Sequence, residues 1–244
     1  MNFTVVIPAR YDSQRLPGKA LLDIAGKPMI QWVYEQAKLS KADSVVVATD
    51  DKRIADAVKQ FGGEHCMTSK DHVSGTDRIQ EVVSLMDISD DKIVVNVQGD
   101  EPLIPPEVIN QVANNLNNSS ASMATLCEKI ESLEDLLDPN IVKVVSDCNK
   151  NALYFSRAAI PFDRDQNQLL DNTCYFRHVG IYAYRASLLN KFVTWAPDQI
   201  ELIEKLEQLR VLRQGYSINV DESVLPIPPG VDTEKDLERT RAFF

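Results

Sequence analysis

The sequence predicts an α/β fold built on a doubly wound, mostly parallel sheet. Short β-branched runs alternate with amphipathic segments along the first half of the chain. Continuous apolar runs of about five residues between polar turns are typical of strands that are buried on both faces of a parallel sheet. A segment with apolar residues at helical spacing follows each of them, and this alternation is typical of doubly wound sheets.

Three strand and helix pairs are expected in the first half. We expect the strands at "FTVVI" (3–7), "SVVVAT" (44–49) and "KIVVNVQ" (92–98), and the helices at "PMIQWVYEQAKLS" (28–40), "DKRIADAVKQFGG" (51–63) and "PPEVINQVANNL" (105–116). Ligands of such sheets bind beyond the carboxyl ends of the strands. The loops after Ile7, Ala48 and Val97 are therefore where we expect the functional site.

The second half of the chain departs from this alternation. Strands are predicted at "IVKVVSD" (141–147), "ALYFSRAAIP" (152–161) and "RHVGIYAYR" (177–185), and their separation by "CNKN" and by a polar stretch indicates antiparallel additions; "SINVDE" (217–222) follows near the end of the chain. The polar stretch from Asp163 to Thr173 predicts a mobile loop. The segment "QIELIEKLEQLRVLRQG" (199–215) predicts one amphipathic helix that ends at Gly215, and "TEKDLERTRAFF" predicts a last helix capped by Asp232 or Thr233.

Composition excludes several classes of partner. The 244 residues carry a formal net charge of -10, which argues against nucleic acid or an anionic membrane surface as the main partner. Because the chain has no apolar run of about 18 residues and no basic, signal-like start, we expect no membrane span and a cytoplasmic protein. The four cysteines are scattered singly, which predicts reduced thiols and no zinc site.

The loop after the first predicted strand is locally basic. It reads "PARYDSQRLPGKALLDIAGKP" and carries Arg10, Arg15, Lys19 and Lys27. Charged loops are usually only solvated, but a loop that leaves the first strand of a doubly wound sheet, with a glycine at Gly18 for close approach, can hold a triphosphate. Neither a Walker A motif nor G-x-G-x-x-G is present, so P-loop kinases and dinucleotide dehydrogenases are disfavoured.

Two acidic positions are candidate metal ligands, and each has a structural alternative. The motif "QGDEP" follows a predicted central strand and directs Asp100 into the expected crevice, whereas Asp232 in "GVDT" stands where a helix cap is expected. Magnesium needs only one or two carboxylates beside phosphate oxygens. The motif "SGTDR" (74–78) reads most simply as a capped helix start.

Taken together, these motifs resemble one family along nearly the whole chain. The blocks "PARYDSQRLPGKALLDIAGKPMI", "TSKDHVSGTDR", "VVNVQGDEPLIPP", "ALYFSRAAIP", "RHVGIYAYR", "EKLEQLR" and "PPGVDTEKDLE" are similar, in order, to those of the 3-deoxy-manno-octulosonate cytidylyltransferases. These enzymes make CMP-Kdo and pyrophosphate from CTP and 3-deoxy-manno-octulosonate (Kdo) with magnesium, for lipopolysaccharide biosynthesis. Two residues, Asp12 and Ala20, depart from the expected pattern of the first block, where a small residue and a proline would stand.

The resemblance implies a nucleotide-diphospho-sugar transferase-like fold and a set of site residues. It implies one domain over residues 1–244, in which residues 150–215 form an antiparallel sugar-binding and dimerisation subregion, and it implies a homodimer. It assigns the catalytic and metal roles to Arg10, Lys19, Asp100 and Asp232, with Mg²⁺ on Asp100 and Asp232. It assigns CTP to Arg10, Arg15, Lys19, Ser74, Gly75, Arg78 and Asp100, and Kdo to Gln98, Arg157, His178, Tyr182 and Glu207.

Elementary chemistry agrees with these roles and leaves alternatives open. Attack of the sugar's anomeric hydroxyl on the α-phosphorus of CTP calls for cations and metal ligands more than for a covalent nucleophile. A guanidinium such as that of Arg157 can bind the Kdo carboxylate with two hydrogen bonds. A related enzyme for 8-amino-Kdo or sialic acid, a glycosyltransferase and a non-catalytic nucleotide-binding module remain alternatives. The D-x-D motif common in glycosyltransferases is missing at Asp100.

Overall fold

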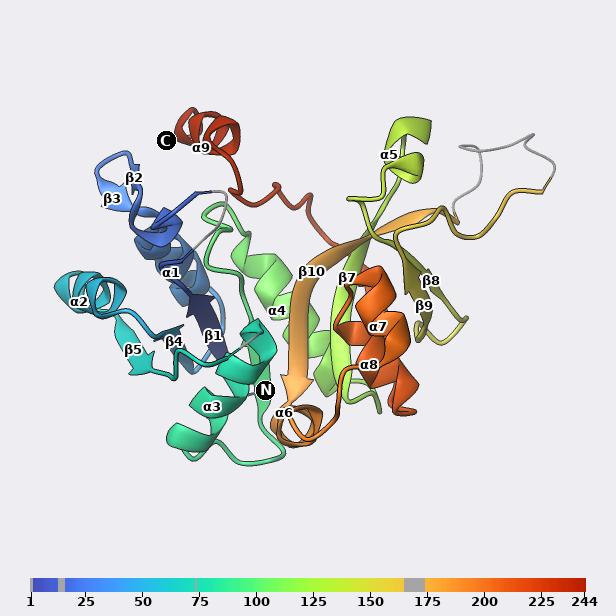
Figure 1. The fold of residues 1–244 in the computed structure, drawn as a ribbon, viewed down its shortest axis with the longest axis horizontal. Helices are drawn as coiled ribbons and strands as arrows, with labels where there is room; N and C mark the ends of the chain where they lie inside the picture. The colour runs from blue at the N-terminus through green and yellow to red at the C-terminus, as the bar shows by residue number, and fades with distance from the viewer. Residues whose placement is uncertain (1, 13–15, 73, 165–173) are drawn as a thin grey trace.

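The computed structural model describes residues 2–12, 16–72, 74–164 and 174–244 (Figure 1). Within these ranges, the main sheet has nine strands, in the order β11-β7-β10-β6-β1-β4-β5, with β8 and β9 attached through β10. The parallel part contains β1 (Phe3–Ala9), β4 (Ser44–Thr49), β5 (Glu64–Met67) and β6 (Ile93–Asn96). The predicted α/β class and its mostly parallel sheet are confirmed.

Helices cover both faces of this sheet because side chains alternate along each strand. Val5 and Ile7 of β1 pack in one core cluster with residues of α1 (Met29–Leu39) and α4 (Pro106–Asn117). Val6, between them, belongs to a second cluster with residues of α3 (Gly75–Leu85) and α6 (Ala186–Phe192). The remaining predicted helix of the first half is α2 (Lys52–Gln60). Strands β1, β4 and β6 are thus buried on both faces, as their apolar runs predict, whereas the edge strand β5 is partly exposed.

The second half adds antiparallel strands to the same sheet. The long strand β10 (Phe176–Arg185) runs antiparallel to both β6 and β7 (Met123–Lys129), and β7 pairs in parallel with β11 (Ile218–Glu222). The outer pair is β8 (Lys143–Ser146) and β9 (Ala152–Ser156), beside the short helix α5 (Leu133–Leu137) in Figure 1. The predicted loop from Asp163 to Thr173 lies mostly outside the described residues.

The single helix predicted over residues 199–215 is wrong, because the chain breaks it in two. Helix α7 (Gln199–Glu204) ends at Lys205, which has a left-handed backbone with φ 55°, and α8 (Gln208–Arg213) begins three residues later. The apolar spacing continues through the break, so the periodicity alone does not reveal it. The predicted stop at Gly215, with φ 78°, is confirmed.

The C-terminal segment returns to the N-terminal end of the chain. Helix α9 (Glu234–Arg241) lies beside the hairpin of β2 (Asp23–Ile24) and β3 (Lys27–Pro28), and Arg241 donates to the carbonyl oxygen of Asp23 at 2.8 Å (Figure 1). The N-cap is Thr233, whose side chain accepts from the backbone of Asp236. Within the described part of the chain, no helix is long and apolar enough to cross a membrane.

A close approach between the loops after β1 and β6 requires glycine at position 99. A Cβ on Gly99 would lie 2.8 Å from the carbonyl oxygen of Pro8, closer than real Cβ atoms come to backbone. Because the obstacle is backbone rather than a flexible side chain, neither loop can yield without moving a strand end. Gly99 therefore sets the spacing of the two loops.

We expect Gly99→Ala to lower the free energy of unfolding by about 1–3 kcal/mol, the usual cost of overpacking. Urea unfolding measures this cost. Gly180→Ala is the matched control, because a Cβ at Gly180 would meet no atom within 4 Å and its φ is not positive. Equal stability of the two variants would contradict the close-approach argument.

Candidate active site

The sheet places the site at the point where its winding reverses. Strand β1 lies between β4 and β6, so the chain leaves β1 toward one side of the sheet and later returns on the other. The carboxyl ends of β1 and β6 consequently diverge into a crevice, where ligands of open α/β sheets bind. The loops after Ile7 and Val97 meet there, as predicted.

A cavity of about 260 Å³, here called the β1–β6 cavity, opens between these two loops. It collects five predicted site residues, Arg10, Lys19, Gly75, Gln98 and Asp100, from separate parts of the chain. Its lining residues are Pro8, Ala9, Arg10, Asp12, Lys19, Gly75, Gln98, Gly99 and Asp100. One departure from the family pattern, Asp12, thus faces the cavity, whereas the other, Ala20, is buried in the core.

Lys19 joins two acidic residues that are far apart in sequence. Its Nζ donates to Oδ2 of Asp100 and, at 3.1 Å, to Oδ1 of Asp232. Burial by itself would lower the pKa of Lys19, but the charges and hydrogen bonds of Asp100 and Asp232 outweigh burial and raise it. The side chains are 19% exposed for Lys19, 24% for Asp100 and 45% for Asp232, so a ligand in the crevice can reach all three.

The two carboxylates are suited to a divalent cation. Within the described residues, no group of three or more His, Cys, Asp or Glu could hold a metal ion. Magnesium, however, is commonly held by one or two carboxylates together with substrate phosphates. Because Asp100 and Asp232 converge on one ammonium group, they can converge on one small cation. The N-cap of α9 is Thr233, so the alternative role of Asp232 as that cap is excluded.

The basic loop is shaped by Gly18 and leaves one cation partly unpaired. Gly18 has φ 68°, and its N–H donates to the carbonyl oxygen of Tyr11 at 2.8 Å, so the chain turns sharply into Lys19. Nη2 of Arg10 is buried and has no hydrogen-bond partner among the described residues. Burial, together with the charge of Arg78, lowers the pKa of Arg10. An anion in the cavity would supply the missing partner.

A second cavity of about 320 Å³, here called the α8 cavity, adjoins the first. The two cavities share Gly75 and Gln98 as lining residues. The wall of the second cavity combines polar side chains, those of Thr76, Asn96, Tyr182, Tyr184, Glu207 and Gln208, with the apolar side chains of Met123, Phe192, Leu206 and Val211. The predicted sugar contacts Gln98, Tyr182 and Glu207 therefore come together in one cavity.

The broken helix accounts for the position of Glu207. After the left-handed turn at Lys205, Glu207 stands at the start of α8, and Thr76 of α3 donates to its Oε2 at 2.8 Å. Burial raises the pKa of Glu207, and the hydrogen bond from Thr76 partly offsets this effect. An unbroken helix over 199–215 would continue straight past this point, so the break is part of the site.

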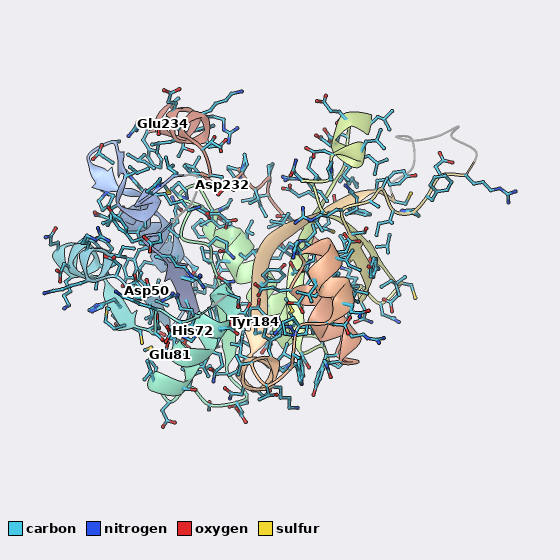
Figure 2. All side chains as sticks on the ribbon, in the orientation of Figure 1. Asp50, His72, Glu81, Tyr184, Asp232 and Glu234 are labelled. Carbon is cyan, nitrogen blue, oxygen red and sulfur yellow. The ribbon has the colours of Figure 1, made fainter. Side chains whose placement is uncertain are left out.

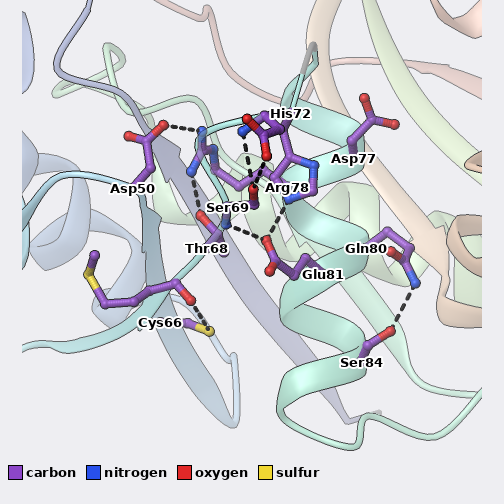
Figure 3. Close-up of polar contacts among 12 residues, drawn as sticks. Asp50, Cys66, Thr68, Ser69, His72, Asp77, Arg78, Gln80, Glu81 and Ser84 are labelled. Atoms are coloured by element: carbon purple, nitrogen blue, oxygen red, sulfur yellow. Dashed lines mark hydrogen bonds and ion pairs between the residues drawn. The ribbon is translucent and has the colours of Figure 1, made fainter.

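The motif at residues 74–78 builds the helix start that its residue types predict. Ser74 caps α3 in a capping box with Asp77. Arg78 has a fully buried side chain, which donates to Thr68 and, at 2.8 Å, to Asp50 (Figure 3). Its predicted contact with cytidine stays a prediction, because the guanidinium has no exposed surface here. What Arg78 does in this structure is tie the loops after β4 and β5 to α3.

A second anchor holds the loop before α3. Oε2 of Glu81 accepts from the N–H of Ser69 at 2.8 Å and contacts Nε2 of His72 at 2.5 Å (Figure 3). Glu81 therefore fixes, from within α3, the chain that leads into Ser74. Asp50, His72 and Glu81 lie close together in the view of Figure 2, with Tyr184 to their right and Asp232 above them.

Two predicted sugar contacts line neither cavity. Arg157 donates to the carbonyl oxygens of Glu204 at 2.7 Å and Pro139 at 2.9 Å. The His178 ring lies edge-on to Phe155, and its Nε2 is 3.0 Å from Oγ1 of Thr125. Both assignments stay predictions. Arg15, also predicted to bind CTP, lies outside the described residues.

Sequence reasoning missed several residues that line the two cavities, among them the polar residues Thr76, Asn96 and Gln208. Thr76 reads as part of a helix start, Asn96 as part of an apolar strand, and Gln208 as one polar position of an amphipathic helix. Of these three, only Asn96 could have been found from the sequence, because an amide in a buried central strand is unusual unless it has a polar partner. Thr76 and Gln208 lie in predicted helices, where polar residues are common and do not indicate a site.

Comparison with known proteins agrees with this geometry. The family model described as cytidylyltransferase matches residues 4–220. A 3-deoxy-manno-octulosonate cytidylyltransferase of Vibrio vulnificus is 60% identical over 247 residues, which cover 100% of this chain and 98% of the relative. The relative of the same description from Photobacterium profundum is 57% identical, and the match covers 100% of both chains.

The chain belongs to the 3-deoxy-manno-octulosonate cytidylyltransferase family. A solved structure of CMP:2-keto-3-deoxy-manno-octonic acid synthetase complexed with CTP has the same fold, with a TM-score of 0.92 and 44% identity. The match covers 100% of this chain and 98% of that one. The predicted resemblance is therefore confirmed over the full length of the chain.

In this family member, we expect the neutral state of His178 to make folding sensitive to acid. Burial lowers the pKa of His178 to about 3. The unfolded chain binds that proton below about pH 6.5 and the folded chain does not, so stability falls as pH drops from about 6.5 toward 3. His178→Gln should reduce the slope of the unfolding free energy in this range by up to about 1.4 kcal/mol per pH unit.

Urea unfolding at a series of pH values measures this slope. His65→Gln, on the partly exposed strand β5, controls for loss of an imidazole elsewhere. Parallel pH curves for the wild-type chain and His178→Gln would contradict the buried, neutral histidine.

Proposed function

We infer that the chain is a cytidylyltransferase that joins CTP to Kdo and releases pyrophosphate. The observation that carries this inference is the pair of adjoining cavities with a shared wall at Gly75 and Gln98. One cavity offers cations and carboxylates suited to a triphosphate, and the other offers hydrogen-bonding groups suited to a polyhydroxylated sugar. The shared wall is where the α-phosphorus and the anomeric hydroxyl would meet.

The reaction requires the protein to position the two substrates and to stabilise the negative charge that develops on the leaving oxygens. The anomeric hydroxyl attacks the α-phosphorus in line and loses its proton to solvent, the bond from that phosphorus to the bridging oxygen breaks, and pyrophosphate leaves. Arg10 and Lys19 bind the triphosphate and stabilise the charge that develops on the leaving oxygens. Gln98 and Glu207 orient the sugar so that its anomeric hydroxyl faces the phosphorus.

We propose that magnesium is the metal of this reaction and that Asp100 and Asp232 hold it. A bound magnesium ion neutralises phosphate charge and orients the α-phosphoryl group. Lys19 contacts both carboxylates, so its ammonium group is placed to turn toward the phosphates as the acids take up the cation. In this proposal, the ammonium group of Lys19 and the metal ion both bind the same triphosphate.

We also propose a homodimer that works in the cytoplasm, with residues 150–215 in sugar binding and dimer contact. Exposed apolar side chains support such a contact, with Leu137 of α5 63% exposed, Leu153 of β9 62% and Phe162 80%. Exposure of large apolar side chains to water is unfavourable, and burial of these side chains in an interface with a second copy of the chain would remove that cost. The single domain over 1–244 and the cytoplasmic location remain predictions.

We expect purified protein to release pyrophosphate from CTP only when Kdo and magnesium are both present. ATP and GTP should serve poorly, and among ulosonic acids Kdo should exceed 8-amino-Kdo and sialic acid in kcat/KM. A coupled pyrophosphate assay measures all of these. Absence of turnover with any ulosonate would favour the non-catalytic nucleotide-binding module, and preference for another ulosonate would reassign the substrate.

Asp100→Asn and Asp232→Asn should each lower kcat by about 100-fold or more, as loss of a charge-stabilising group does. Both should also raise the magnesium concentration needed for half the maximal rate, while the melting temperature stays near that of the wild type. Activity across a magnesium titration measures this. Glu234→Gln, in the exposed first turn of α9, is the control. Unchanged magnesium dependence for Asp232→Asn would leave Asp100 as the single protein ligand.

A further inference from the structure

The segment between β11 and α9, residues 223–231, leads the chain to Asp232 and is here called the strap. All of its residues are described, and none lies in a helix or strand. It runs from β11 past the ends of β7 and β10 to Asp100 after β6. In Figure 1 it is the red trace that starts beside β7 and β10 and leads to α9. Because the strap ends at a proposed metal ligand, the contacts that fix the strap also fix that ligand.

Glu128 of β7 and Arg177 of β10 hold the strap at Ile227. The two residues stand opposite each other in the antiparallel strand pair and form an ion pair. Oε1 of Glu128 accepts from the backbone N–H of Ile227 at 2.8 Å, and Nη2 of Arg177 donates to the backbone carbonyl oxygen of Ile227 at 3.4 Å. The ion pair thus binds both backbone groups of this buried residue, and it is here called the Ile227 clamp.

Few other contacts hold this part of the strap. A cavity of about 590 Å³ lies between the clamp, the end of β7 and residues 222–226, so the strap is not packed tightly against the sheet there. Among the described residues, the strap backbone is hydrogen-bonded to the rest of the chain at its first two residues, at Ile227 and at Val231. The clamp is therefore the anchor between the start of the strap and its end.

The chain between the clamp and Asp232 is stiff. It reads "PPGVD" (228–232), and its two prolines fix φ at successive positions. Gly230 then passes so close to Asp100 that a Cβ on it would lie 3.3 Å from the Asp100 carbonyl oxygen. The N–H of Val231 donates to that same oxygen at 2.8 Å. The position of the clamp is therefore passed along the prolines to Asp232.

The clamp is independent of the groups that metal binding would rearrange. Lys19 contacts Asp232 and, at 3.4 Å, the carbonyl oxygen of Val231. In the proposed reaction Lys19 turns toward the phosphates, and the strap then loses both contacts. The clamp uses none of these groups, so it still holds the strap when the carboxylates take up the cation.

We propose that Glu128 and Arg177 are positioning residues for the magnesium site, because the Ile227 clamp holds Asp232 ready beside Asp100. A ligand that is held in place loses little conformational freedom when the metal binds. Loss of a residue that supports a metal ligand typically lowers metal affinity by about 10- to 100-fold. This proposal rests on the proposed function, because it takes Asp232 as a magnesium ligand.

The first test is the magnesium dependence of turnover. Arg177→Met and Glu128→Leu should each raise the magnesium concentration for half the maximal rate about 10-fold, while kcat at saturating magnesium stays within about threefold of the wild type. Excess magnesium should therefore rescue both variants, unlike Asp232→Asn. Glu128→Gln should keep the half-saturating concentration within about threefold of the wild type, because its amide oxygen can still accept from Ile227.

The half-saturating concentration does not depend on how much of a variant is folded. A clamp that merely stabilised the fold would lower the rate at every magnesium concentration and leave this value unchanged. Lys150→Met is the matched control for Arg177→Met, because Lys150 forms an ion pair with Asp221 of β11 that does not involve the strap. It should keep the magnesium dependence of the wild type.

Calorimetric titration of CTP into the protein without Kdo tests the same site without turnover. At a magnesium concentration below saturation, Arg177→Met should bind CTP about 10-fold more weakly than the wild type, and without magnesium the two should bind CTP alike. If the wild type turns over Kdo with magnesium and both clamp variants keep its magnesium dependence, this inference is wrong. An equal shift in Lys150→Met would also overturn it. If the wild type needs no magnesium or turns over no ulosonate, the proposed function itself fails.

Discussion

A single ammonium group joins three segments of the chain at the β1–β6 cavity. Nζ of Lys19, in the turn after β1, contacts Asp100 after β6 and Asp232 before α9. These contacts span 81 and 213 residues of sequence, so the two ends of the chain and its central strand meet at one point. Two carboxylates this close would repel each other without a cation between them. Lys19 supplies such a cation between them.

The cations at this site contrast with the acidic composition of the whole chain. The chain carries a formal net charge of -10, yet its substrates are a triphosphate and a sugar acid, both anionic. Long-range attraction therefore cannot bring them in, and the site must offer local cations. Arg10 offers a buried Nη2 that has no hydrogen-bond partner in the described part of the chain. Lys19 offers an ammonium group whose two carboxylate partners are suited to bind a metal ion instead. Substrate binding would supply an anionic partner for these cations. Burying a cation without such a partner lowers the stability of the free protein.

Sequence reasoning predicted the parallel part of the fold well, and for a clear reason. Strands β1, β4 and β6 are buried on both faces, so their composition alone marks them, and the functional loops follow from their order. The break at Lys205 could not be predicted, because the apolar spacing continues through its left-handed turn. Arg78 illustrates a different limit. Its charge suggests a ligand contact, but only the fold shows that Asp50 and Thr68 already occupy it.

The places where sequence rules fail are also the places where the two cavities are built. The broken helix directs Glu207 and Gln208 into the α8 cavity, and the amide of Asn96 interrupts a strand that is otherwise apolar from Ile93 to Val95. Each feature costs stability locally, through a left-handed residue or an unpaired buried atom. Natural sequences tolerate such conflicts mainly where a ligand offsets them. The clustering of these conflicts around one cavity is therefore independent support for a polar, hydroxyl-bearing occupant, beyond what family membership implies.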